Sequence, residues 1–192
     1  MKSNNPYAII TVQEVEPVME GRMEMYQAGD KVVYGMHGVC EVVELEKRVI
    51  ERKTVTYLVL EPVGQQGTRY LVPAHNEAAM KKVRPMLSRE DMDALLSSET
   101  VHTDAWIKDE GQRKQLYRDL INSGDRQRLL QMSHTLYSHR ETQTAMGKKV
   151  HMCDDNFLRD AEKLLCSELS VILDIPANEA KQYLRRKLKE DA

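Results

Sequence analysis

The residues best suited to chemistry in this 192-residue sequence are two histidine–cysteine pairs. His37 and Cys40 have an H-x-x-C spacing, and His151 with Cys153 would complete four potential metal ligands on paper. Structural zinc sites normally show paired, close spacings, whereas separated half-motifs of this kind usually arise by chance. Cys40 also alternates to the inner side of a predicted strand. We therefore predict no metal site.

Other signatures of catalysis are missing from the sequence. It has no glycine-rich phosphate loop, no G-x-S-x-G and no H-E-x-x-H. Its carboxylates stand at helix-cap positions or on charged helix faces, where no isolated acid–base pair is formed. The composition, 41% hydrophobic and 30% charged, is that of a folded chain. We predict a binding protein without a cofactor and not an enzyme.

Charge and cysteine content restrict the partners and the compartment. A formal net charge of −2 gives no general attraction to nucleic acid, but the stretch from Trp106 to Lys149 has nine Lys/Arg against five Asp/Glu. Three cysteines, an odd count, fit a reducing compartment. No apolar run approaches the roughly 20 residues of a membrane span, and the N-terminus lacks the apolar core of a signal peptide. We predict a cytoplasmic protein without membrane contact.

The elements that must position the candidate residues change in periodicity along the chain. Residues 1–24 have no clean period and are predicted to be a poorly ordered N-terminal extension. Residues 25–87 contain short alternating strands, which predict a small SH3-like or Tudor-like β-barrel. Residues 88–192 have a period of 3.6 and predict a compact all-α bundle of about five helices. The expected fold class is α+β.

Local signals predict the bounds of these elements. We expect Ser88 to cap the first helix, the second to start near Asp104 with Trp106 in its first turn, and Asp125 to cap the third. Either Asp154 or Asp155 should cap the fourth helix, and Pro176 suits the first turn of the fifth. The expected strands are Lys31–Tyr34, Val39–Leu45 with a continuation at Val49 and Ile50, Thr54–Leu60, and Arg69–Val72.

The most distinctive sequence motifs lie in the predicted strands. They are Gly29–Tyr34, Gly35–Val39, Glu44–Arg48, Tyr57–Leu60 and Tyr70–Pro73. These motifs resemble the amino-terminal domain of the CarD/CdnL family of bacterial transcription regulators, a domain also found in the transcription-repair coupling factor. The resemblance continues through Trp106, Ser123–Asp125 and Leu164–Leu169, and covers about Met25 to Leu188.

The resemblance implies a mechanism without covalent chemistry. In this family the barrel docks on the β subunit of RNA polymerase by strand-to-strand contact. The helical domain reaches promoter DNA at the upstream edge of the bubble, where a Trp wedges into the minor groove and stabilises the open complex. The chain would then be a nucleoid-associated monomer.

Two polymerase-contact positions carry over from the family. Arg48 stands at a basic contact position after the second strand. Leu71 stands where many members have an Arg, so either that contact is apolar here or Arg69, on the same strand face, replaces it. Without the resemblance, Arg48 would be interpreted as a solvated strand-end charge.

The DNA-contact positions are less regular. Trp106 stands at the wedge position, although such a residue is more often a core side chain. The nearby acidic residues Asp109 and Glu110 would repel phosphates. The cations available for DNA are Lys108, Arg113, Lys114, Lys148 and Lys149.

Two other classes of function stay open. The chain could be a protein-interaction adaptor whose helical domain does not contact DNA. An enzyme would be favoured only by a bound metal or cofactor.

Overall fold

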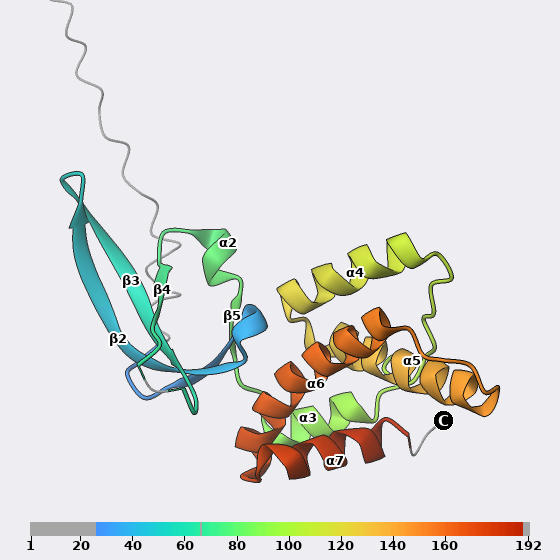
Figure 1. The fold of residues 1–192 in the computed structure, drawn as a ribbon. Helices are drawn as coiled ribbons and strands as arrows, with labels where there is room; N and C mark the ends of the chain where they lie inside the picture. Colours follow the sequence, from blue (N-terminus) through green and yellow to red (C-terminus); the bar gives the residue numbers. More distant parts are fainter. Residues whose placement is uncertain (1–25, 66, 190–192) are drawn as a thin grey trace, which may run out of the picture.

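The computed structural model describes residues 26–65 and 67–189 (Figure 1). Its strands are β1 (Lys31–Tyr34), β2 (Val39–Ile50), β3 (Lys53–Pro62), β4 (Tyr70–Pro73) and β5 (Val83–Pro85). Its helices are η1 (Gly35–His37), α2 (Glu77–Met80), α3 (Arg89–Leu96), α4 (Glu110–Ser123), α5 (Arg126–Ala145), α6 (Met152–Leu173) and α7 (Ala177–Lys187). The predicted α+β class is confirmed. The predicted N-terminal extension, residues 1–24, lies outside the described residues.

The strands form one antiparallel sheet in the order β4-β3-β2-β1-β5. β4 and β5 lie at opposite edges, and no strand pairing joins them in the described part of the chain. The prediction of an SH3-like or Tudor-like barrel is therefore wrong in that the sheet is not closed. Edge strands of four and three residues are too short to bend round and meet.

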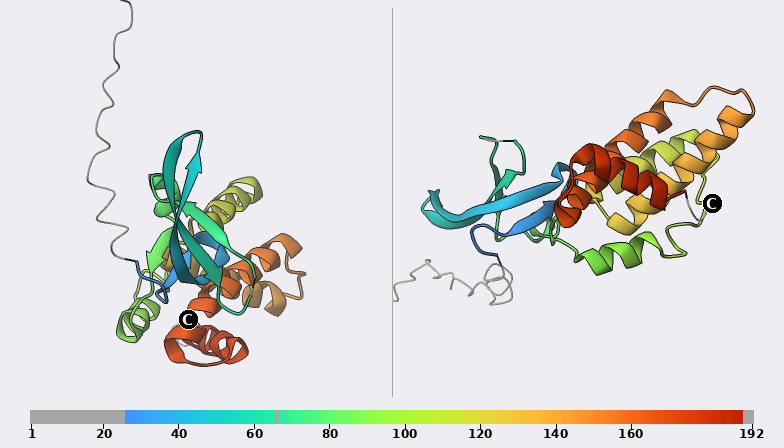
Figure 2. Two further views of the ribbon diagram at one scale, coloured as in Figure 1. Left: turned by 90° about the vertical axis from the view of Figure 1, so that its left-hand side faces the viewer. Right: turned by 90° about the horizontal axis from the view of Figure 1, so that it is seen from below.

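The hairpin of β2 and β3 dominates the sheet. β2 is one continuous strand of 12 residues, and it pairs with β3 up to Ile50 and Lys53. The two turn residues, Glu51 and Arg52, have φ angles of 49° and 65°. Such a two-residue turn matches the twist of the strands but usually contains Asn or Gly. The hairpin projects away from the helices (Figure 2).

One face of the sheet carries an apolar core. Because side chains alternate along a strand, residues of one parity from each strand meet there. α2 covers part of it through Met80. The buried members are Tyr26, Val32, Cys40, Val42, Leu58, Leu60, Val72, Met80 and Val83.

Helices α3 to α7 enclose a second apolar cluster. The largest fully buried side chains in it are Tyr117, Met92, Leu96, Leu129, Leu130, Leu169, Leu184 and Leu188. None of the described helices is both long enough and apolar enough to cross a membrane.

Helix α6 packs against α4, α5 and α7 and carries three buried carboxylates. Each carboxylate forms an ion pair with an arginine from a different helix, which satisfies the charge that burial would otherwise leave uncompensated. The pairs are Asp154 with Arg113 of α4, Glu168 with Arg126 of α5, and Glu162 with Arg185 of α7.

Two of the predicted helix caps are confirmed, and one predicted helix start is wrong. As predicted, Ser88 caps α3 and Asp125 caps α5. The Ser88 side chain accepts the backbone N–H of Asp91, and the Asp125 side chain accepts that of Arg128. The predicted start near Asp104 is wrong, because α4 begins at Glu110 and Asp109 is its cap. Asp104 instead accepts the N–H of Trp106 in a local turn, so Trp106 precedes the helix.

The start of α6 also differs from the prediction. His151 occupies the cap position and makes no side-chain cap bond. Asp154, predicted as a possible cap, points into the core and pairs with Arg113. The fifth helix, α7, begins after Pro176, one residue later than the sequence suggested.

Candidate functional site

The three residues predicted to contact polymerase share one face of the sheet. Arg48 pairs across the strands with Val55, and Leu71 pairs with Val59. Since Val55 and Val59 are four residues apart on β3, both pairs lie on the same face, opposite the apolar core. Arg69 directly precedes β4 and reaches the same face. We call these three residues and their charged neighbours the polar sheet face.

Ion pairs organise the polar sheet face. Arg48 donates from Nε and Nη2 to the two carboxylate oxygens of Glu46, at 2.7 and 3.0 Å. This hydrogen bonding raises the pKa of Arg48 and lowers the pKa of Glu46. Arg69 lies 3.8 Å from a carboxylate oxygen of Glu44 and 3.7 Å from one of Glu61. The face therefore offers both signs of charge, with about half of each arginine side chain exposed.

Unpaired strand edges adjoin the polar sheet face. β4 is an edge strand, and its outer side has no strand partner among the described residues. The outer side of β2 is likewise unpaired beyond Val42 in the described part of the chain. In an antiparallel sheet, alternate residues of such an edge turn their backbone N–H and C=O groups outward. A strand from a partner could pair with either edge.

Trp106 and its neighbours form the second candidate region, at the start of α4. The indole ring stacks on His139 of α5, with 3.4 Å between ring centroids and 12° between planes. The Arg113 guanidinium lies 4.3 Å from the centroid of the indole. Burial is the main reason that the pKa of His139 is lowered. Asp154 raises this pKa and Arg113 lowers it, so their effects oppose each other. The imidazole is therefore neutral at pH 7.

Arg113 is held inside the protein. It donates to both carboxylate oxygens of Asp154, at 3.0 and 3.1 Å, and to the carbonyl of Ile107 at 2.8 Å. Its exposed fraction is 4%, so it is not a surface cation. Sequence spacing could have indicated this, because Arg113 shares the buried face of α4 with Tyr117 and Leu120.

The other predicted DNA-contact residues are lysines with varied surroundings. Lys108 is exposed in the segment before α4. Lys114 pairs with Glu110 one turn earlier on the helix. Lys148 and Lys149 are exposed in the connection from α5 to α6. Sequence reasoning missed His139, since no local pattern marks a ring-stacking partner from another helix.

The histidine–cysteine pairs are used in other ways. The His37 ring lies 5.1 Å from that of Tyr34 and 4.1 Å from that of Tyr70. Cys40 is fully buried, and burial raises the pKa of its thiol to about 11. Within residues 26–65 and 67–189, no three His, Cys, Asp or Glu residues are grouped as metal ligands would be.

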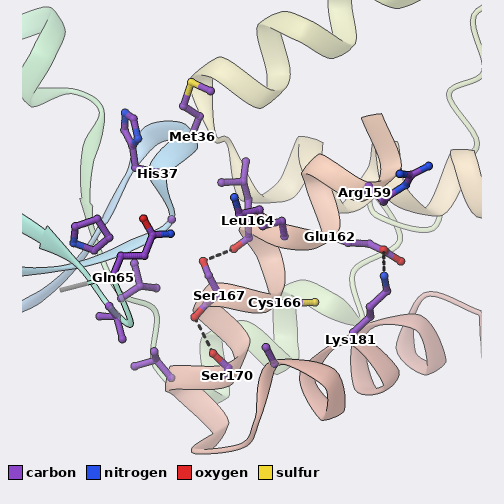
Figure 3. Close-up of a pocket in the computed structure, with 17 residues that line it drawn as sticks. Met36, His37, Gln65, Arg159, Glu162, Leu164, Cys166, Ser167, Ser170 and Lys181 are labelled. Carbon is purple, nitrogen blue, oxygen red and sulfur yellow. Dashed lines mark hydrogen bonds and ion pairs between the residues drawn. The ribbon is translucent and has the colours of Figure 1, made fainter. Parts of the chain in front are cut away.

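A cleft of about 410 Å³ lies between the β1–β2 turn and helices α6 and α7 (Figure 3). Glu162 in its wall forms an ion pair with Lys181 at 2.6 Å. The Ser167 and Ser170 hydroxyls donate to carbonyls of their own helix. The carboxylate and hydroxyls of the cleft therefore already have partners.

Comparison with known proteins gives a family match over the segment that forms the sheet. The family model described as the CarD-like/TRCF RID domain matches residues 26–84, the segment that contains β1 to β4 and most of β5. The description of this family indicates a domain for interaction with RNA polymerase. No curated protein matches the sequence.

Proposed function

We propose that this CarD-like chain, which carries the CarD-like/TRCF RID domain at residues 26–84, is a transcription regulator that binds the RNA polymerase β subunit and stabilises the promoter open complex. The match over the sheet carries the proposal. Residues 25–87 would bind the polymerase, and residues 88–192 would contact DNA at the upstream edge of the bubble.

The polar sheet face supports the first half of this function. Leu71 lies on the edge strand β4, and Arg69 directly precedes that strand. Arg48 lies on the same face, two strands away. A strand of the β subunit that paired with β4 would gain main-chain hydrogen bonds. The arginines would then contact its side chains, and they would set the register through charge.

Replacing Arg48 with glutamate should weaken binding to the β subunit by about ten-fold or more, because it removes one attraction and places a second carboxylate beside Glu46. Affinity for the isolated β subunit and thermal melting measure the two effects separately. The matched control is Lys81→Glu at the C-terminal cap of α2, an equal charge reversal beside Glu77, away from the polar sheet face. Equal affinities for the two folded variants would rule out Arg48 as a contact.

The start of α4 supports the DNA half. Trp106 is half-buried and lies next to the exposed Lys108, with Lys114 one helical turn into α4. A lysine can neutralise a phosphate while a flat ring inserts at a distorted base step. We assign Arg113 a positioning role, because it holds the indole and is itself fixed by Asp154.

Replacing Trp106 with alanine should shorten the lifetime of the open complex by about 5–150-fold, the equivalent of roughly 1–3 kcal/mol of lost stacking. Promoter dissociation kinetics with and without the variant measure this. The control is His139→Ala, which removes the stacking partner and keeps the indole. Comparable lifetimes for both variants at equal folded fractions would contradict a direct contact of Trp106 with DNA.

A second candidate, an interaction adaptor that never touches DNA, has one observation in its favour. The Trp106 ring is already stacked on His139, and Arg113 is internal. Trp106 is the single Trp, so its fluorescence reports on this site alone. Titration with upstream-fork promoter DNA should change that fluorescence if DNA binds here, and leave it unchanged for an adaptor.

A further inference from the structure

The sheet and the helices are joined by a buried charged contact. Arg126, at the start of α5, donates from Nε to both carboxylate oxygens of Glu168 on α6, at 2.8 and 2.7 Å. The same guanidinium donates from Nη2 to the carbonyl of Pro85, the last residue of β5, at 2.5 Å. The Leu87 N–H donates to Glu168 at 3.4 Å. One ion pair of the helices therefore binds the segment that leaves the sheet.

A second arginine makes the reciprocal contact. Arg84 of β5 donates from Nη2 to the carbonyl of Gly124, in the turn between α4 and α5. Arg84 is partly buried and close to Arg126, and the Glu168 and Asp125 carboxylates oppose the repulsion between the two guanidiniums. Glu168, 2% exposed, supplies the compensating charge. Removing it would leave the two cations with the exposed Asp125 as the remaining carboxylate near Arg84.

Two glycines let the parts touch through their backbones. A Cβ on Gly124, which has φ +63°, would lie 3.0 Å from both Arg84 Nη2 and the carbonyl oxygen of Gly35. A Cβ on Gly38 would lie 2.6 Å from the Ser167 hydroxyl of α6. A side chain at either position would collide with the facing part, so Gly38 and Gly124 allow the sheet and the helices to lie in close contact.

We infer that Arg84, Arg126 and Glu168, together with the close approaches at Gly38 and Gly124, form a clasp that fixes the orientation of the sheet relative to the helices. The role of the clasp rests on the proposed function. A protein that binds polymerase with its sheet and DNA with its helices can hold these two partners in a fixed arrangement only if its sheet and helices are themselves fixed relative to each other.

Without the clasp, little would hold the sheet in one orientation on the helices. Only the short segment between Pro85 and Arg89 connects β5 to α3. Interfaces between parts of one chain commonly permit relative motion unless they are large and apolar. Here the contact is polar, its carboxylate is buried, and one planar guanidinium bonds Glu168 through Nε and the Pro85 carbonyl through Nη2, which fixes its orientation. Glu168 and Arg126 are therefore positioning residues.

Distance measurements between the two parts test the clasp directly. Spin labels would be attached to cysteines at Val49, on the hairpin, and Met152, at the start of α6, which are 75% and 76% exposed. Cys153→Ser removes the half-exposed native thiol, while Cys40 and Cys166 are buried. The full chain is measured without polymerase or DNA, so failure of the proposed function cannot alter the result.

The test compares Glu168→Gln with a matched control, Glu162→Gln. Both change a buried carboxylate of α6, but the partners of Glu162 all belong to the helices. Glu168→Gln should broaden the interspin distance distribution at least two-fold, and Glu162→Gln should leave its width unchanged. Where Glu168→Gln fails to fold, Arg126→Lys, which keeps the charge and loses the planar guanidinium that bridges Glu168 and Pro85, takes its place.

Circular dichroism at the measuring temperature must show both variants folded. An unchanged width in folded Glu168→Gln, or in its Arg126→Lys substitute, would overturn the clasp, because the pair would then contribute to stability alone. Equal broadening in both carboxylate variants would also overturn it, since that result follows from general loosening of α6. A separate assay of β-subunit affinity should show no change for Glu168→Gln, because the polar sheet face is intact.

Discussion

Replacing Asp154 with asparagine should lower the free energy of unfolding by about 3–5 kcal/mol, because it leaves the Arg113 guanidinium buried without a counter-charge. The two side chains are 3% and 5% exposed, so water cannot replace the lost partner. The asparagine has nearly the same shape, which confines the effect to charge and hydrogen bonding. Urea unfolding followed by circular dichroism at pH 7 measures it.

The neighbouring residue provides a matched control for Asp154. Asp155 is on the same helical turn, but its side chain is 36% exposed and lies 3.7 Å from an exposed Arg140. Asp155→Asn should change the free energy of unfolding by no more than about 0.5 kcal/mol. Similar losses in both variants would mean that the buried pair has no special role.

The same variant also tests the positioning of Trp106. Arg113 lies against the indole, so a loosened guanidinium should change Trp106 fluorescence in the folded protein. If Trp106 contacts DNA, Asp154→Asn should shorten the open-complex lifetime at conditions where the protein is fully folded. Asp155→Asn should change neither the fluorescence nor the lifetime.

The second large effect is expected at Glu162. Its carboxylate is 3% exposed and accepts hydrogen bonds from Tyr137, Lys181 and Arg185. Glu162→Gln should lower the free energy of unfolding by about 2–3 kcal/mol at pH 7, the scale of hydrogen bonds to a charged group. The two cationic partners are partly exposed, so solvent offsets some of the loss.

The effect of Glu162 depends on pH in a defined direction. Burial alone would raise the pKa of Glu162, but hydrogen bonds from Lys181, Tyr137 and Arg185 lower it below the usual value. Its stabilisation is therefore complete above the unfolded pKa of about 4.3 and is lost as the pH falls through the lower folded value. Urea unfolding from pH 7 to pH 3 should show the wild type and Glu162→Gln converging at the acid end.

An exposed glutamate separates this effect from general charge loss. Glu141→Gln on α5 removes an ion pair with Lys189 that is about half exposed on both sides. Its unfolding curve should follow that of the wild type at every pH within about 0.5 kcal/mol. A constant difference between wild type and Glu162→Gln down to pH 3 would contradict the assigned pKa shift.

Local chemistry made much of the fold predictable. The strands of the hairpin were expected from β-branched and aromatic residues, and the caps at Ser88 and Asp125 from side chains that accept backbone N–H groups. β5 was missed because Val83–Pro85 is too short for any period, and its place depends on pairing with the distant β1. The openness of the sheet depends on the same non-local pairing.

The candidate sites also have a part that local sequence patterns predict and a part that depends on contacts between distant residues. The alternation of β2 and β4 places Arg48 and Leu71 on one face, which a strand pattern can predict once the register is known. The spacing of Arg113 from Tyr117 and Leu120 indicates that it is buried, but its partner Asp154 is 41 residues away, and no local signal connects the two. Asp154 looked like a helix cap because aspartate near a helix start usually is one.

The unpaired outer side of β2 has a consequence for the behaviour of the protein at high concentration. Leu45, Val49 and Ile50 are exposed near the end of the hairpin, and a free edge with such side chains is a template for a second copy of the same strand. The intervening charges, Glu46, Lys47 and Arg48, must lose water when copies stack, which opposes aggregation. A more neutral strand here would therefore be expected to self-associate, so the charges that we propose for the polymerase contact would also oppose aggregation.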